Sequence, residues 1–225
     1  MASKALRRQG ELGASYSALP LSFELNQGQT NGAVKFLSRA SGYLLFLTAT
    51  EAVMALDNPA AQRKAKVNRE ELLRTNENEP RPPRPIVRMK LEGANPAPHV
   101  EGLDQLTSSS SYFGGPDPAQ WRTNIPSYSR VRYEQVYPGI DMLYYGSRRQ
   151  LEYDFIVAPR ADPAVVEIGF KGIEGLEIST MGDLLLHTAQ GDIRQRKPIA
   201  YQQANGTRKE VSASYIPKGA SGIGF

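Results

Sequence analysis

Residues 136 to 157, VYPGIDMLYYGSRRQLEYDFIV, constrain the fold more than any other stretch of the sequence. Two runs rich in Ile, Leu, Tyr and Phe flank the polar break Gly146-Ser147-Arg148-Arg149. β-Branched and aromatic residues suit a pleated, half-buried surface, and a break that contains glycine allows the chain to turn. In the second run apolar and polar residues alternate, which is the period of a strand with one buried face. The stretch therefore predicts a β-hairpin. The buried face of its second strand consists of Leu151, Tyr153, Phe155 and Val157.

Short apolar runs separated by turn residues fill much of the remaining chain. Asn205-Gly206 lies between two such runs, and Asn-Gly is among the stronger hairpin signals. Tyr43 to Leu47 is apolar throughout, which indicates a strand buried on both faces. This spacing predicts an all-β, antiparallel, sandwich-like module of many short strands rather than a βαβ fold. Strands are expected at 34–38, 43–48, 52–56, 86–91, 165–171, 176–180, 183–188, 193–202 and 209–216.

Two segments depart from this pattern. Within the surface excursion at 58–85, residues 60–73 favour a helix, and four prolines between 80 and 85 then exclude regular structure. Residues 95–123 are rich in Ser, Gly and Pro and are expected to form loops, with Trp121 packing them onto the core.

The expected organisation has three parts that follow one another along the chain. Residues 1–18 are small and polar and predict a flexible tail. Residues 19–124 form an N-terminal β-rich part and residues 125–225 a C-terminal antiparallel part, packed together as one unit. The chain stops on the apolar Phe225, from which we expect truncation from a longer protein.

Composition excludes several classes of function. Hydrophobic residues make up 40% and charged residues 22%, near the globular norm, and a net charge of +4 without a basic, aromatic stripe argues against nucleic-acid binding. The absence of cysteine excludes disulfides and thiolate metal sites.

No apolar run reaches the roughly 20 residues of a membrane helix. The basic N-terminus lacks the apolar region of a signal peptide, so either the protein is cytoplasmic or its signal is missing from the sequence given.

Catalytic motifs are sparse. No G-x-S-x-G elbow and no phosphate-binding loop occur. The two histidines are far apart in sequence: we expect His187 at a strand end and His99 in an exposed loop. They disfavour a zinc or copper centre, and no cofactor is expected.

The carboxylates of the predicted hairpin are the one arrangement in the sequence that suits catalysis or metal binding. If Gly146 pairs with Arg149 in the hairpin, Asp141 faces Asp154, and Glu152 shares their side of the sheet, with opposed Cβ atoms roughly 5 Å apart. Such a group suits the acid/base pair of a glycosidase, with Asp141, Glu152 and Asp154 as the catalytic candidates. It also suits a calcium site formed by Asp141 and Asp154. The third interpretation, which we favour, is a polar outer face neutralised by nearby arginines.

Aromatic and polar side chains supply the other candidates. Tyrosines crowd the hairpin, and tyrosines on strands either pack or line a sugar-binding surface. The ligand-binding candidates are Tyr145, Arg149 and Trp121. Near the start of the β-rich part, Asn26, Gln27 and Gln29 are expected to cap a turn.

Three phrases carry a resemblance to a known family: F-E-x-N-x-G-Q at Phe23 to Gln29, Y-P-G-I-D at Tyr137 to Asp141, and L-E-Y-D-F at Leu151 to Phe155. In this order, within a resemblance from Leu19 to Ile216, they resemble the N-terminal module of large secreted bacterial proteins with SBBP-type β-propeller repeats, and related modules of adhesin-like cell-surface proteins. Arg160 stands where that family leads us to expect glycine.

The resemblance implies a secreted or cell-surface module, not inserted in a membrane, that precedes a β-propeller and brings no catalytic residues. We therefore expect a non-catalytic structural or recognition module. Its expected partners are its own downstream propeller repeats and a surface glycan or polymer. A carbohydrate-active hydrolase and a calcium-dependent adhesion module remain the alternatives, and the sequence commits the chain to no reaction.

Overall fold

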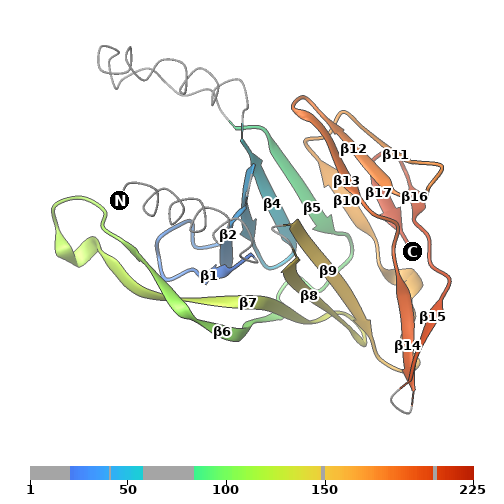
Figure 1. Cartoon of the computed structure of the whole chain (residues 1–225), viewed down its shortest axis with the longest axis horizontal. Helices are drawn as coiled ribbons and strands as arrows, with labels where there is room; N and C mark the ends of the chain where they lie inside the picture. The colour runs from blue at the N-terminus through green and yellow to red at the C-terminus, as the bar shows by residue number, and fades with distance from the viewer. Residues whose placement is uncertain (1–20, 41, 58–83, 148–149, 205–206) are drawn as a thin grey trace, which may run out of the picture. The chain divides into compact units, whose positions relative to one another are not determined.

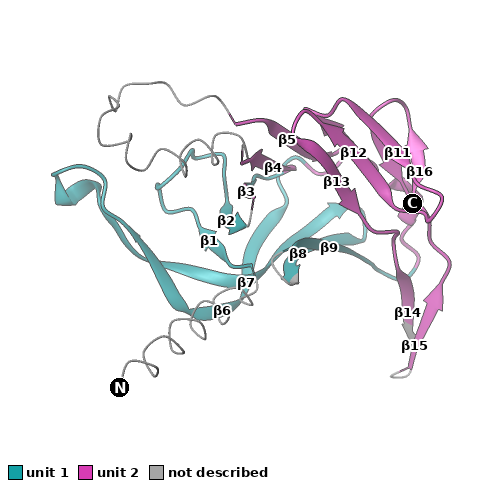
Figure 2. Cartoon of the chain, turned by 45° about the horizontal axis from the view of Figure 1, so that its top comes forward, with its two compact units in different colours: residues 1–41, 45–49, 96–159 teal, residues 42–44, 50–95, 160–225 magenta. Residues whose placement is uncertain are grey.

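The computed structural model describes residues 21–40, 42–57, 84–147, 150–204 and 207–225, and over these ranges the protein is built from antiparallel strands (Figure 1). The predicted all-β, sandwich-like class is confirmed. The expected tail at 1–18 and helix at 60–73 lie outside the described residues, as does most of the proline-rich excursion. The chain divides into two compact units, residues 1–41, 45–49 and 96–159, and residues 42–44, 50–95 and 160–225 (Figure 2).

The first unit is organised by one long strand, β7, which pairs with β1, β6 and β8. Its strand order is β3-β2-β1-β7-β8-β9, with β6 added along β7, and of β3 it contains residues 45–47. The strands are β1 (Phe23–Leu25), β2 (Phe36–Ala40), β3 (Tyr43–Leu47), β6 (His99–Tyr112), β7 (Arg122–Tyr137), β8 (Ile140–Ser147) and β9 (Gln150–Val157). A short 3-10 turn, η1 (Pro118–Gln120), lies in the connection from β6 to β7. The largest fully buried side chains of this unit are Phe23, Phe36, Leu45, Leu47, Ile125, Ile140 and Met142.

The second unit contains three pieces of sheet. The largest has the order β16-β17-β10-β5-β4, and separate sheets are formed by β11-β12-β13 and by β14-β15. The elements are β4 (Glu51–Leu56), β5 (Ile86–Leu91), η2 (Pro163–Val165), β10 (Ile168–Lys171), β11 (Gly175–Ile178), β12 (Leu184–Thr188), β13 (Gly191–Gln195), β14 (Ala200–Ala204), β15 (Thr207–Val211), β16 (Ile216–Lys218) and β17 (Gly222–Gly224). In its core Ile168, Leu184, Leu186 and Ile223 are fully buried, and Asp183 and Thr188 are buried as well.

Most predicted strands are present within a few residues. β5 has the predicted bounds, and the pairing of Ala204 with Thr207 confirms the hairpin expected around residues 205–206. The run 193–202 is divided between β13 and β14, and Pro198, which has no backbone N–H to donate, lies in the gap. The boundary expected after residue 124, between the N-terminal and C-terminal parts, falls inside β7.

Three predictions are wrong, two about residues 95–123 and one about residues 43–47. Residues 99–112, expected as loop, form β6, which obtains its backbone hydrogen bonds from β7 although many of its side chains are exposed and polar. Trp121 does not pack onto the core: it is 38% exposed and contacts Phe113 edge to face, with ring centroids 5.2 Å apart. In β3, Leu45 and Leu47 are fully buried, but the alternate residues are only half-buried.

Arg160 occupies a backbone conformation that favours glycine, with φ of +72°. We expect Arg160→Gly to raise the free energy of unfolding by about 0.5–1 kcal/mol, because strain relief exceeds the added freedom of the unfolded chain. Arg160→Ala removes the charge but keeps Cβ, so it is the matched control. Urea unfolding of both variants checks this; equal stability of the two would contradict the strain argument.

Candidate functional site

One face of the strands β6 to β9 is polar while the opposite face lies in the core. Val131, Tyr133, Met142 and Tyr144 are buried on the core side. The side chains of the other face follow the cross-strand register, for example Glu101 opposite Arg132 and Leu143 opposite Asp154. We call this second face the outer polar face. It comprises His99, Glu101, Arg130, Arg132, Glu134, Asp141, Tyr145, Glu152 and Asp154.

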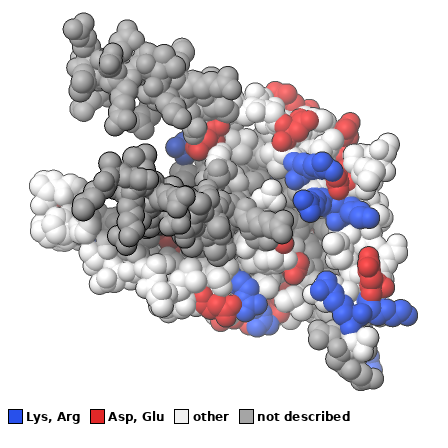
Figure 3. Space-filling view, in the orientation of Figure 1, with Lys and Arg blue, Asp and Glu red and all other residues white. Residues whose placement is uncertain are grey.

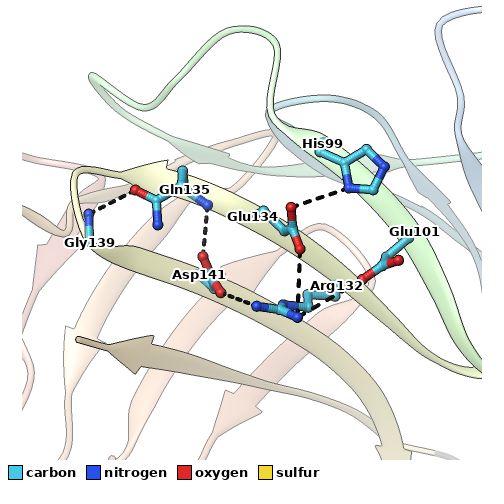
Figure 4. A network of polar contacts seen from close by, with 7 residues as sticks. All are labelled: His99, Glu101, Arg132, Glu134, Gln135, Gly139 and Asp141. Atoms are coloured by element: carbon cyan, nitrogen blue, oxygen red, sulfur yellow. Dashed lines mark hydrogen bonds and ion pairs between the residues drawn. The ribbon is translucent and has the colours of Figure 1, made fainter.

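Asp141 holds together an irregular turn between β7 and β8. The ladder shifts register between Tyr133 and Tyr137, and Gln135 has φ of +52° there. The Gln135 N–H donates to Asp141 Oδ1 at 2.8 Å, and Gln135 Oε1 accepts from the Gly139 N–H at 3.0 Å (Figure 4). Asp141 Oδ2 accepts from Arg132 Nη2 at 2.7 Å. Burial opposes ionisation of Asp141, but these two donors outweigh it and lower the pKa of the carboxyl group.

The hairpin register differs from the predicted one. Gly146 lies opposite Leu151, not Arg149, so Asp141 faces Ile156 rather than Asp154. The four-residue polar break allows a two-residue connection to close either on the pair Gly146 and Arg149 or on the pair Ser147 and Gln150. The second choice, which the structure adopts, shifts the partner of each residue by two positions. All three acids stay on one face, but Asp141 and Asp154 are not directly opposed.

Tyr145 connects the two acids of β9. It lies opposite Glu152, and its hydroxyl donates to Asp154 Oδ1 at 3.1 Å. Burial, followed by the charge of Asp154, raises the pKa of Tyr145, so the phenol remains a donor at neutral pH. Glu152 and Asp154 are both exposed.

The three ligand-binding candidates do not form one site among the described residues. Arg149 lies outside the described residues. Trp121 Nε1 donates to the Gly115 carbonyl at 3.2 Å in the loop between β6 and β7. Tyr145 pairs with Arg130. Arg130 is nine residues after Trp121, and nine residues of extended strand span about 30 Å.

A cluster that the sequence analysis missed lies at the other end of the outer polar face. His99 on β6 is opposite Glu134 on β7, with Nδ1 and Oε2 3.3 Å apart. Arg132 Nη1 lies 3.6 Å from Glu134 and 4.0 Å from Glu101 (Figure 4). His99 and Glu101 are two residues apart and would share a strand face, but this signal requires that the segment be recognised as a strand.

The phrase Phe23 to Gln29 has a structural explanation. Asn26 Nδ2 donates to the Asn31 and Val34 carbonyls, at 2.9 and 2.8 Å, while its Oδ1 accepts from the Gly28 N–H at 3.0 Å. Gln29 Nε2 donates to the Leu25 carbonyl at 2.8 Å. The predicted turn-capping role is confirmed for Asn26 and Gln29, whereas Gln27 takes part through its backbone N–H, which donates to Gln29 Oε1 at 2.6 Å.

Glu24, in the same phrase, is a buried carboxylate with two partners. The Tyr112 hydroxyl donates to its Oε2 at 2.5 Å, and Arg39 lies 3.8 Å from its Oε1. Arg39 also donates to the Tyr112 hydroxyl at 2.7 Å. Glu24 thus fastens β1 to β2 and to the end of β6, which is a structural role.

His187 belongs to the second unit, near the end of β12 as expected. Its Nδ1 lies 2.8 Å from Asp192 Oδ1 and its Nε2 lies 4.0 Å from Glu177. The hydrogen bond to Asp192 raises the pKa of the imidazole.

Asp141→Asn tests the structural role of this acid. The variant keeps an acceptor for the Gln135 N–H but loses the charge paired with Arg132, so we expect the free energy of unfolding to fall by about 1–3 kcal/mol. Asp154→Asn, on the exposed part of the same face, is the control and should stay within about 0.5 kcal/mol of the parent chain. Chemical unfolding at neutral pH measures both; equal losses would contradict the assignment.

The hydrogen bond between His187 and Asp192 predicts that the free energy of unfolding depends on pH. Because its pKa is higher in the folded than in the unfolded state, the pair stabilises the fold fully below about pH 6.5, and this contribution is lost as the pH rises through the folded-state pKa. His187→Gln should therefore cost more stability near about pH 5.5 than near about pH 9. Urea unfolding at both values checks this. In an Asp192→Asn background the difference should shrink, and its persistence would assign the effect to another group.

Acidic and basic side chains are interspersed on the face displayed in Figure 3, without a single-sign stripe there. No helix among the described residues is long and apolar enough to cross a membrane.

Neither a curated protein nor a solved structure matches the chain. A family described as a domain of unknown function, DUF7948, matches residues 23–225. The match covers both units, and the chain therefore belongs to the DUF7948 family.

Proposed function

We propose that this chain is a non-catalytic structural or recognition module of a secreted or cell-surface bacterial protein, in which it precedes a β-propeller. The resemblance carried by the phrases at Phe23–Gln29, Tyr137–Asp141 and Leu151–Phe155 supports the cellular context and the propeller. Two of these phrases have structural explanations, the turn around Asn26 and the turn held by Asp141. Motifs that maintain a fold are what a non-catalytic module requires.

The observation that carries the proposal is that Asp141, on the outer polar face, is hydrogen-bonded to the Gln135 N–H and to Arg132. A glycosidase needs one carboxylic acid whose raised pKa keeps it protonated near neutral pH. Asp141 shows the opposite shift, because the Gln135 N–H and Arg132 stabilise its charged form. Both of its oxygens already accept hydrogen bonds, which also disfavours the proposed calcium site with Asp154.

The part of the face around Tyr145 suits hydroxyl-rich ligands. It offers the exposed acceptors Glu152 and Asp154 beside an aromatic ring. An aromatic ring next to carboxylate acceptors is a common way to bind a sugar ring through stacking and hydrogen bonds. We therefore place recognition of a surface glycan or polymer here.

A glycan and polymer binding screen of this chain tests the proposal. We expect at least one saccharide polymer to bind, and Glu152→Gln/Asp154→Asn to weaken that binding at least about tenfold, equivalent to about 1.4 kcal/mol. The matched control is Glu174→Gln/Glu210→Gln, which makes the same change of charge on exposed acids of the second unit.

The other outcomes point to different functions. Binding that survives the double substitution would move the site off this face. Release of shortened saccharides would favour the hydrolase instead. A calcium-induced rise in Tm that a chelator reverses and Asp154→Asn abolishes would favour calcium-dependent adhesion.

A further inference from the structure

We propose that His99, Glu101 and Glu134 bind a divalent transition-metal ion of the Zn²⁺ type on the outer polar face. This inference is independent of the proposed function, because it concerns a different group of residues from Tyr145, Glu152 and Asp154.

The register of β6 and β7 brings the three ligands together. His99 is directly opposite Glu134, and Glu101 follows two residues later on the same face of β6. One ligand atom from each side chain lies within 4.8 Å of the other two. Metal–ligand bonds of about 2.0–2.2 Å place ligand atoms roughly 3–4 Å apart, so small side-chain rotations complete the site. Figure 4 shows the side chains of His99 and Glu134 directed toward each other, with Glu101 beside them.

The charge of the surrounding network favours a dication. Arg132 lies closest to Asp141, at 2.7 Å, and further from Glu134 and Glu101, at 3.6 and 4.0 Å. Three carboxylates thus share one guanidinium, which leaves a net charge of −2 when His99 is neutral. Because its strongest contact is to Asp141, Arg132 keeps a partner when a metal ion takes the oxygens of the two glutamates.

The donor set indicates the class of metal. Calcium and magnesium prefer oxygen ligands alone, whereas an imidazole nitrogen with two carboxylates suits zinc and neighbouring transition metals. Three protein ligands on an exposed surface leave further coordination positions for water. His99 is 65% exposed at its side chain, so an ion reaches it without rearrangement of the core.

Calorimetric titration of Zn²⁺ into the metal-stripped chain, carrying no histidine tag, tests the proposal. We expect one equivalent to bind. His99→Gln and Glu134→Gln should each weaken binding at least tenfold. The chain has only two histidines, so His187→Gln is the matched control and should leave the affinity unchanged. All substitutions are at side chains with substantial exposure, and thermal unfolding is used to check that each variant is folded.

Nitrogen-15 correlation spectra of the histidine rings give a second readout. Zn²⁺ should shift the His99 ring signals at one equivalent and leave those of His187 in place. Absence of stoichiometric binding, unchanged affinity of His99→Gln, or loss of binding in His187→Gln would each overturn the assignment.

Discussion

The pairing of β7 with three other strands is the constraint on which the first unit depends. This strand contacts β1, β6 and β8, so its register decides which side chains meet on each face. A one-residue slip would move the buried Val131 and Tyr133 to the outer polar face and the charged Arg132 into the core. The free-energy cost of exposing those side chains and burying a charge fixes the register far more tightly than backbone hydrogen bonds alone.

The turn that follows β7 shows how one acid acquires a structural role. The phrase Y-P-G-I-D ends in Asp141, which accepts a backbone N–H from the irregular segment and neutralises Arg132. Gly139 has φ of +73°, a conformation that glycine adopts without strain. A carboxylate with both oxygens engaged is poorly suited to exchange protons with a substrate, which is why the geometry argues for architecture at this position.

Sequence reasoning succeeded where local pattern and tertiary structure agree. Alternation predicted the two faces of β9, but Leu151, Tyr153 and Phe155 are only half-buried and Val157, which was expected to be buried, is 40% exposed. Polar amides after a short apolar run predicted the turn around Asn26. It failed where the decisive information lies in another strand. The serine-rich part of β6 has little hydrophobic periodicity, and its strand character comes from pairing with β7. The hairpin register depended on where a polar break turns, which composition does not specify.

Arg132 links the structural and the proposed binding parts of the outer polar face. Its guanidinium lies between Asp141, which holds the turn, and the glutamates beside His99. The contact to Asp141 at 2.7 Å is a hydrogen bond as well as an ion pair, whereas the contacts at 3.6 and 4.0 Å are ion pairs only. The arginine therefore helps to anchor the turn, while its single positive charge is shared with Glu101 and Glu134. The Gln135 N–H and this guanidinium together keep Asp141 in its charged form. Because one guanidinium faces three carboxylates, negative charge remains near His99.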